Sequence, residues 1–288
     1  MRRDPSVFRL AAAPIAAFAV TWIAAFWPIV SLAQVPLTPL KASGQTVTPV
    51  FEGWYPNPDG TYSLSFGYFN RNSEEVVDIP IGPDNFIQPG DANQGQPTSF
   101  HPRRHWGVFA VTVPADFGDR KVVWTLKLRG GTFAIPGSLH PDWQIDALEG
   151  EAGGNTPPVL KLDENGPEGW GPLGVAAGPL GATVGAPLTL SIWAADDGRA
   201  WGSIGSAGKQ GVPVTLTYFK HQGRGQVTFS VPKDSVDYRG GKATVSATFS
   251  EPGAYILRVR ANDASGVADA GHAQCCWTNG FVKVVVAR

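Results

Sequence analysis

Two runs of alternating apolar and polar residues lie on either side of a Glu-Pro-Gly turn in the second half of the chain. Every second side chain is apolar in residues 243–249 and again in residues 255–261, whereas Lys242, Arg258 and Arg260 fall on the opposite face. A period of two is typical of antiparallel strands that bury one face and leave the other in water. We therefore expect the second half of the chain to fold around this pair of strands.

The same alternation predicts strands in the first half of the chain. Residues 48–55 and 61–70 are joined by the sequence Asn-Pro-Asp-Gly, in which proline presets φ and glycine accepts a positive φ, so a β-hairpin is expected there. Further strands are predicted at residues 76–79, 106–113, 121–128 and 132–135. Because this is the usual size of a β-sandwich, residues 48–149 are predicted to form a first domain.

The second predicted domain spans residues 186–288. Besides the two runs at 243–249 and 255–261, its alternation predicts strands at residues 188–192, 214–218, 227–229 and 281–286. This spacing indicates an immunoglobulin-like sandwich. The fold class predicted from the sequence is therefore all-β, with two immunoglobulin-like antiparallel β-sandwich domains that follow an N-terminal signal peptide.

Two stretches of the chain fall outside these domains. Residues 150–185 are rich in Gly, Pro and Ala and are predicted to be a linker, although the short apolar piece at 159–162 could be the first strand of the second domain. Residues 34–47 are expected to be a tether or a first edge strand.

Composition supports a β-rich protein and argues against one class of partner. The 288 residues include 35 glycines and 25 prolines, which disfavour long helices. The formal net charge is −1 and no dense stripe of Lys and Arg occurs, so nucleic acid is not an expected partner.

Residues 1–33 have the pattern of a signal peptide. Three arginines precede an apolar run at residues 10–30, and the small residues Ser31 and Ala33 place the expected cleavage site before Gln34. The apolar run is also long enough to span a membrane, so an uncleaved anchor is the alternative, and only then is a membrane contact expected. In both cases the folded part is exported, to a periplasmic, cell-surface or secreted location.

The pair of C-terminal strands resembles a known class of module. The sequence Phe-Ser-Glu-Pro-Gly-Ala-Tyr at 249–255, which leads to Asn262 and Asp263, resembles the late strands of PKD-type and related immunoglobulin-like modules of bacterial surface proteins. Those modules place a tyrosine just after the turn and an aspartate at the end of the strand. The resemblance covers roughly residues 186–288 and implies a fold rather than an activity.

A second resemblance extends over the whole chain. The sequences Phe-Glu-Gly-Trp-Tyr at 51–55, Asn-Pro-Asp-Gly at 57–60 and Gln-Cys-Cys-Trp-Thr-Asn-Gly at 274–280 are similar to those of a family of secreted bacterial proteins. This resemblance implies export and a β-sandwich architecture, and it implies no activity.

The longest segment without periodicity is residues 80–105. A loop of that length inside a compact domain is uncommon and is usually functional or disordered. Its candidate binding residues are Phe86, Arg103, Arg104 and His105, because aromatic and arginine side chains often anchor partners. The alternative for the two arginines is an exposed strand edge or ion pairs with nearby carboxylates.

The same segment contains two histidines at a spacing that can bind metal. His101 and His105 are four residues apart, which on a helix places both side chains on one face. Pro102 argues against a helix here, so a hydrogen-bonded loop is expected instead and no metal or other cofactor is predicted.

Aromatic residues supply the remaining candidates for binding. Trp54 and Tyr55 lie in a predicted strand, and Trp201 lies in a Gly-rich loop. Such rings stack on the apolar faces of sugars when exposed, or pack in the core when buried. Alternation predicts that one of Tyr68 and Phe69 is buried and the other is not.

Cys275 and Cys276 are the two cysteines of the chain and are adjacent. In an exported protein an even number of cysteines indicates a disulfide. Neighbouring Cα atoms are about 3.8 Å apart, or about 2.9 Å across a cis peptide, which is below the usual span of a disulfide, so such a bridge is expected to be strained. The alternatives are two free thiols and a metal site with His272.

The sequence contains no nucleophile elbow, P-loop, dinucleotide fingerprint or zinc-helix motif. We therefore expect an exported, non-catalytic binding or structural protein that acts through loop and aromatic surfaces. Its expected partner is an unidentified protein or a cell-surface polysaccharide. The two alternatives are a carbohydrate-binding module and a secreted hydrolase whose active site lies in loops.

Overall fold

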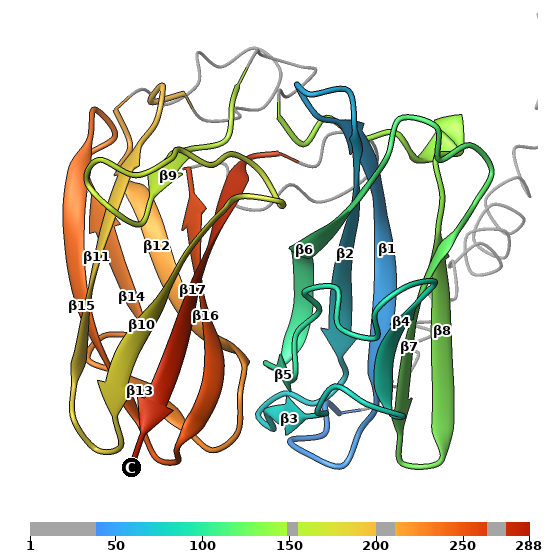
Figure 1. The fold of residues 1–288 in the computed structure, drawn as a ribbon, viewed down its shortest axis with the longest axis horizontal. Helices are drawn as coiled ribbons and strands as arrows, with labels where there is room; N and C mark the ends of the chain where they lie inside the picture. The colour runs from blue at the N-terminus through green and yellow to red at the C-terminus, as the bar shows by residue number, and fades with distance from the viewer. Residues whose placement is uncertain (1–38, 149–154, 200–210, 264–274) are drawn as a thin grey trace, which may run out of the picture. The chain divides into compact units, whose positions relative to one another are not determined.

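The computed structural model describes residues 39–148, 155–199, 211–263 and 275–288, so the predicted signal peptide and Trp201 lie outside the described residues. Leu40–Arg288 forms one compact unit. Apart from one short 3-10 helix, η2 (Pro141–Trp143), the regular elements of the described residues are β-strands (Figure 1). The predicted all-β class is therefore confirmed.

The first sandwich is formed by two three-stranded antiparallel sheets and a short ladder. The first sheet contains β1 (Val47–Pro56), β2 (Tyr62–Asn70) and β6 (Arg103–Val113); the second contains β4 (Asn85–Gln88), β7 (Val122–Leu128) and β8 (Gly131–Gly137); the ladder pairs β3 (Val77–Asp78) with β5 (Ser99–Phe100). Phe66 and Phe109 from the first sheet stack with ring centroids 5.4 Å apart, and Trp124 from the second meets both edge-on. These residues are the apolar members of the alternating pattern, which explains why it predicts the strands.

The second sandwich packs a five-stranded sheet against a four-stranded sheet. The five-stranded sheet has the order β10 (Val175–Thr183), β17 (Trp277–Ala287), β16 (Gly253–Asn262), β12 (Val214–Gln222) and β14 (Lys233–Val236). The four-stranded sheet has the order β13 (Val227–Phe229), β15 (Gly241–Phe249), β11 (Leu188–Ala195) and β9 (Val159–Lys161). The two alternating runs form β15 and β16, which lie in different sheets and do not pair with each other, and their apolar faces are buried between the sheets.

Two strands lie where the sequence predicts a linker. β9 and β10 both fall within residues 150–185, and β10 pairs in parallel with β17, so the sheet is not purely antiparallel. Most of the β10 side chains are small or exposed, and the strand joins the sheet through its backbone. No alternation of apolar residues marks such a strand, which is why its sequence resembles that of a linker.

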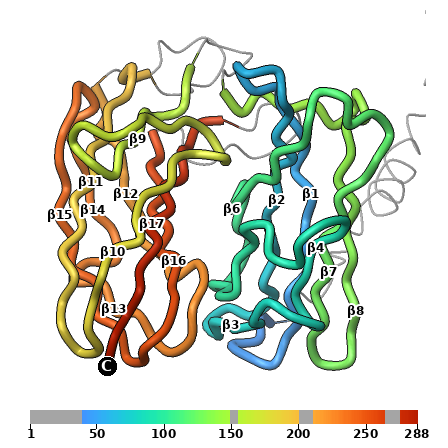
Figure 2. Tube along the Cα trace, in the orientation of Figure 1, coloured from blue at the N-terminus to red at the C-terminus, as the bar shows by residue number. Residues whose placement is uncertain are grey.

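Residues 80–105 are packed into the first sandwich along much of their length. Figure 2 traces this segment, which follows β2 in the chain, contains β4 and leads into β6. Asn85 is fully buried; its Nδ2 donates to the carbonyl oxygens of Ile79 (2.9 Å) and Pro97 (2.8 Å), and its Oδ1 accepts from the Trp124 indole (3.0 Å). The segment therefore builds part of the core rather than forming a free loop.

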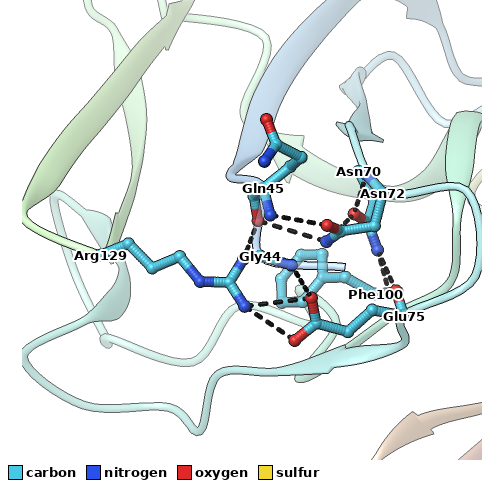
Figure 3. A network of polar contacts seen from close by, with 7 residues as sticks. All are labelled: Gly44, Gln45, Asn70, Asn72, Glu75, Phe100 and Arg129. Carbon is cyan, nitrogen blue, oxygen red and sulfur yellow. Dashed lines mark hydrogen bonds and ion pairs between the residues drawn. The ribbon is translucent and has the colours of Figure 1, made fainter. Parts of the chain in front are cut away.

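The chain preceding β1 is also fastened to the first sandwich. Figure 3 shows that the Arg129 guanidinium contacts the Glu75 carboxylate and the backbone carbonyl of Gln45, while Glu75 accepts from the Gly44 amide (2.7 Å). The Asn72 side chain accepts from the Gln45 amide (2.6 Å). This network of polar contacts thus holds the described part of the predicted tether. Each surface ion pair in it contributes about 1 kcal/mol or less.

Candidate functional site

The first sandwich covers part of the outer face of the five-stranded sheet, whereas Lys283 and Val285 on the same face of β17 stay exposed. The side chains that alternate with the core residues of β12, β16 and β17 lie on this face: Phe219, His221, Arg258, Arg260, Trp277, Asn279 and Phe281. The Trp277 indole and the Asn279 amide both donate to the backbone oxygen of Gly107, at 3.2 Å and 2.7 Å. We call this contact between the sandwiches the seam.

Residues from the 80–105 segment form the rest of the seam. The Thr98 amide donates to the His221 carbonyl (2.8 Å), and His221 Nε2 lies 2.7 Å from the Gly95 oxygen. Gln222 Nε2 donates to the Gln96 oxygen (2.6 Å). Backbone groups of this segment are therefore used in contacts within the chain.

Arg258 is the most unusual group in the seam. Its side chain was expected to face water, but the residue is only 2% exposed, because the first sandwich covers this face of β16. Its Nη1 makes long contacts to the Val108 oxygen (3.4 Å) and to Asn279 Oδ1 (3.3 Å), and its guanidinium lies 4.5 Å from the Phe219 ring centroid. Burial lowers the pKa of Arg258 to about 9, which still leaves it charged at neutral pH.

Three histidines in and beside the seam are held neutral. Burial lowers the pKa of His101 to about 4 and that of His221 to about 3, and it holds the pKa of His105 well below the usual value. The charge of Arg258 acts in the same direction on all three. The seam therefore has few charges at neutral pH, and most of those are arginines.

His105, one of the predicted binding residues, lies at the seam, and Arg104 precedes it on β6. His105 stacks on Tyr68 at 4.9 Å between ring centroids and meets Phe219 edge-on at 5.7 Å. Arg104 makes a bidentate contact to the buried Glu52 carboxylate, at 2.8 Å and 2.7 Å. Burial raises the pKa of Glu52 to about 7, even though Arg104 lowers it, so this ion pair is costly to desolvate.

Trp54 and Tyr55 are both held by hydrogen bonds within the protein. The Trp54 indole donates to the His140 oxygen (2.8 Å). Tyr55 is 2% exposed, its hydroxyl accepts from the Leu173 amide (3.0 Å), and burial raises its pKa to about 12. Neither ring is a freely exposed platform, and the alternation at Tyr68 likewise places that ring in the core.

The remaining predicted binding residues are apart from the seam contacts. Phe86 is half-buried, with Lys127 Nζ 5.7 Å from its ring centroid. Arg103 is exposed, has a positive φ of 72° and lies over the Phe69 ring at 5.2 Å. Trp201 lies outside the described residues, so its role stays a prediction.

The two cysteines form a disulfide with each other. Cys275 and Cys276 are both buried, and they directly precede Trp277, the first residue of β17. Of the three readings of this pair, the structure contains the vicinal disulfide. His272, the suggested third metal ligand, is not among the described residues.

A cavity of about 320 Å³ opens beside the seam, and we call it the seam hollow. The rings of Tyr218 and Phe229, whose centroids are 5.7 Å apart, form one wall together with aliphatic side chains. The hydroxyls of Ser99 and Tyr218 are buried and have no hydrogen-bond partner within the described residues. The full lining consists of Val76, Ser99, His101, Tyr218, Lys220, Gln226, Val227, Thr228, Phe229 and Pro232.

The polar groups of the seam hollow carry little net charge. Lys220 Nζ is paired with the Asp78 carboxylate at 2.8 Å and also donates to the Gly225 oxygen at 2.7 Å. Burial raises the pKa of Tyr218 to about 12, so its phenol stays protonated, and His101 is neutral for the reason given above. The hollow therefore favours an uncharged ligand that offers both an apolar surface and hydrogen-bonding groups.

Sequence reasoning missed the residues of the seam hollow. Ser99, Tyr218 and Phe229 lie on three separate strands, and nothing in their spacing shows that the fold brings them together. A usable signal was the polar run from Lys220 to Gln222, which continues the apolar strand β12 and is buried. A polar run at buried strand positions indicates a face covered by another polar surface.

The described residues contain neither a membrane-spanning helix nor a metal-binding cluster. Among residues 39–148, 155–199, 211–263 and 275–288, no helix is long and apolar enough to cross a membrane. The same ranges contain no group of three or more His, Cys, Asp or Glu side chains placed to hold a metal ion.

Comparison with known proteins gives only a distant likeness. No family model and no curated protein matches the chain. Among solved structures, the D00-D0 domain of intimin matches with 14% identity and a TM-score of 0.24, covering 83% of this chain and 100% of the other. Domains 4 and 5 of the S-layer protein SbsC match with 13% identity and a TM-score of 0.22, covering 85% of this chain and 98% of theirs. The scores are low, so they assign no family and say nothing of function.

Proposed function

We propose that the protein is an exported, non-catalytic binding protein whose seam hollow takes a neutral saccharide. The observation that carries this proposal is a pair of hydroxyls, Ser99 and Tyr218, that have no hydrogen-bond partner among the residues that the structure describes and that line the hollow with the stacked ring of Phe229. A buried hydroxyl without a partner costs about 1–3 kcal/mol, and a ligand hydroxyl would recover that cost.

The size and polarity of the seam hollow support a saccharide. Its volume of about 320 Å³ lies at the lower end of the range for small-molecule sites, roughly 300–1,000 Å³. Sugar rings have apolar faces that pack on aromatic rings, and hydroxyl edges that bond to groups such as Ser99, Tyr218 and His101. The predicted signal peptide supports an exported location, where such ligands are accessible.

The test removes the two hydroxyls. Calorimetric titration would use glucose-, mannose-, galactose- and N-acetylglucosamine-based neutral oligosaccharides, with wild type and the double variant Ser99→Ala/Tyr218→Phe. The double variant is expected to bind about tenfold or more weakly, because two hydrogen bonds to the ligand are lost. Without ligand, its unfolding free energy should be no lower than that of wild type, since neither hydroxyl has a partner to lose within the described residues.

Ser65→Ala is the matched control. Ser65 Oγ is also buried and also has no partner within the described residues, but it does not line the hollow. Its affinity should equal that of wild type. Failure of every oligosaccharide to bind, or equal binding by the double variant, would contradict the proposal.

A further inference from the structure

A second site with different chemistry lies on the outer face of the four-stranded sheet. Trp193 of β11 points away from the core, and its directly paired neighbours are Lys161 on β9 and Lys242 on β15. The indole therefore has a lysine on each side at the same level of the sheet.

These residues line a groove of about 380 Å³, which we call the Trp193 groove. Its other lining residues are mostly small: Val159, Glu168, Ala194, Ala195, Gly240 and Gly241. A Cβ added to Gly240 would approach Ala195 no closer than 3.9 Å, which shows open space beside the indole. The groove can therefore admit a ring-shaped group next to Trp193.

The two lysines of the groove are available to a ligand. Lys242 Nζ lies 5.0 Å from the Trp193 ring centroid, and Lys161 Nζ donates to the Glu164 backbone oxygen at 2.9 Å. Within the described ranges, neither ammonium forms an ion pair with a carboxylate, although Glu168 lines the same groove. Two uncompensated ammonium groups beside an aromatic face recognise a ring that carries negative charge.

We propose that the Trp193 groove binds an acidic polysaccharide built of uronate residues, with a sugar ring on Trp193 and carboxylates on Lys161 and Lys242. The predicted export of the chain favours an extracellular polymer over a nucleotide. β9 is the short outer strand of its sheet, and Gly169 is bridged to Leu160 on its far side, so the groove is bounded there by the segment that carries Glu168. This site is independent of the seam hollow, which selects uncharged ligands.

The experiment is affinity electrophoresis of the folded protein in gels that contain polygalacturonate. Methyl-esterified polygalacturonate, with the same backbone and masked carboxylates, is the matched ligand control. The double variant Lys161→Gln/Lys242→Gln is expected to bind polygalacturonate about tenfold or more weakly than wild type, because two charge-assisted contacts are lost. The methyl-esterified polymer should retard wild type and the double variant equally, because it offers the two lysines no carboxylate.

Matched variants separate a site from general attraction to polyanions. Lys233→Gln/Lys283→Gln removes two exposed lysines elsewhere on the second sandwich and should leave retardation unchanged. The proposal is overturned if polygalacturonate does not retard wild type, or if both double variants lose affinity for it equally. It is likewise overturned if the esterified polymer binds wild type as strongly as polygalacturonate does. It is also overturned if a single-stranded oligonucleotide binds through Lys161 and Lys242 while polygalacturonate does not.

Discussion

Acid should weaken the protein through His221, and the size of this effect follows from its surroundings. The residue is 2% exposed, its ring lies 5.2 Å from that of Phe281, and its Nε2 contacts the Gly95 oxygen at 2.7 Å. Arg258 adds positive charge nearby. An imidazolium is therefore disfavoured at this position, and the pKa of His221 falls from 6.5 to about 3.

The sign of the effect comes from comparing the folded and unfolded states. Above about pH 6.5 the histidine is neutral in both states, so it makes no contribution to the pH dependence. As pH falls below that value, the unfolded chain binds a proton that folded His221 does not, which costs about 1.4 kcal/mol per pH unit until the folded pKa is reached. At about pH 4.5 the loss from this residue is about 3 kcal/mol.

Other groups titrate in the same range, so the measurement must compare variants. The pKa of Glu52 is raised to about 7, which stabilises the folded state as pH falls and partly offsets the histidines. Urea unfolding would be measured at about pH 7.5 and about pH 4.5 for wild type and His221→Gln, which keeps a donor for Gly95. Between these values wild type should lose about 3 kcal/mol more than the variant.

The matched control is His140→Gln. The His140 side chain is 60% exposed, so the same substitution is made at a surface histidine and leaves the seam untouched. If His221→Gln and wild type lose the same stability between the two pH values, the neutral, buried state inferred for this histidine is wrong.

Two further predictions concern the seam and the cysteines. Gly107→Ala should destabilise the protein by about 2–4 kcal/mol in urea unfolding, because the φ of Gly107 is positive and a Cβ would collide with the Trp277 ring. The control Gly118→Ala, also at positive φ but in open space, should cost only about 1 kcal/mol. Equal costs would show that Trp277 does not pack closely on β6. Titration of the denatured, unreduced protein should find no free thiol, because Cys275 and Cys276 are bonded to each other; two titratable thiols would contradict the disulfide.

The alternating pattern was sufficient to predict most strands, but it could not identify what covers each face. Arg258 and Arg260 were placed correctly on the face opposite the core of β16, and yet Arg258 is buried because a second sandwich lies against that face. A sequence with period two shows that one face of a sheet is apolar, and it does not exclude a partner for the other face. The seam is therefore visible only in the structure.

The candidate site was harder to predict than the fold for a related reason. The segment 80–105 was selected because it lacks periodicity, whereas its buried residues, such as Asn85, satisfy backbone groups inside the first sandwich. The seam hollow instead combines Ser99 with Tyr218 and Phe229, which are distant in sequence. Local patterns report local structure, and a cavity formed by separate strands has no local pattern.

The position of β17 constrains the order in which the protein can assemble during synthesis. β17 lies between β10 and β16 in its sheet and supplies Trp277, Asn279 and Phe281 to the seam. Translation delivers β17 after both of its neighbours, so β10 has no neighbour in its sheet until then. A growing chain therefore cannot complete this sheet, or the seam that β17 helps to form, until β17 has been made.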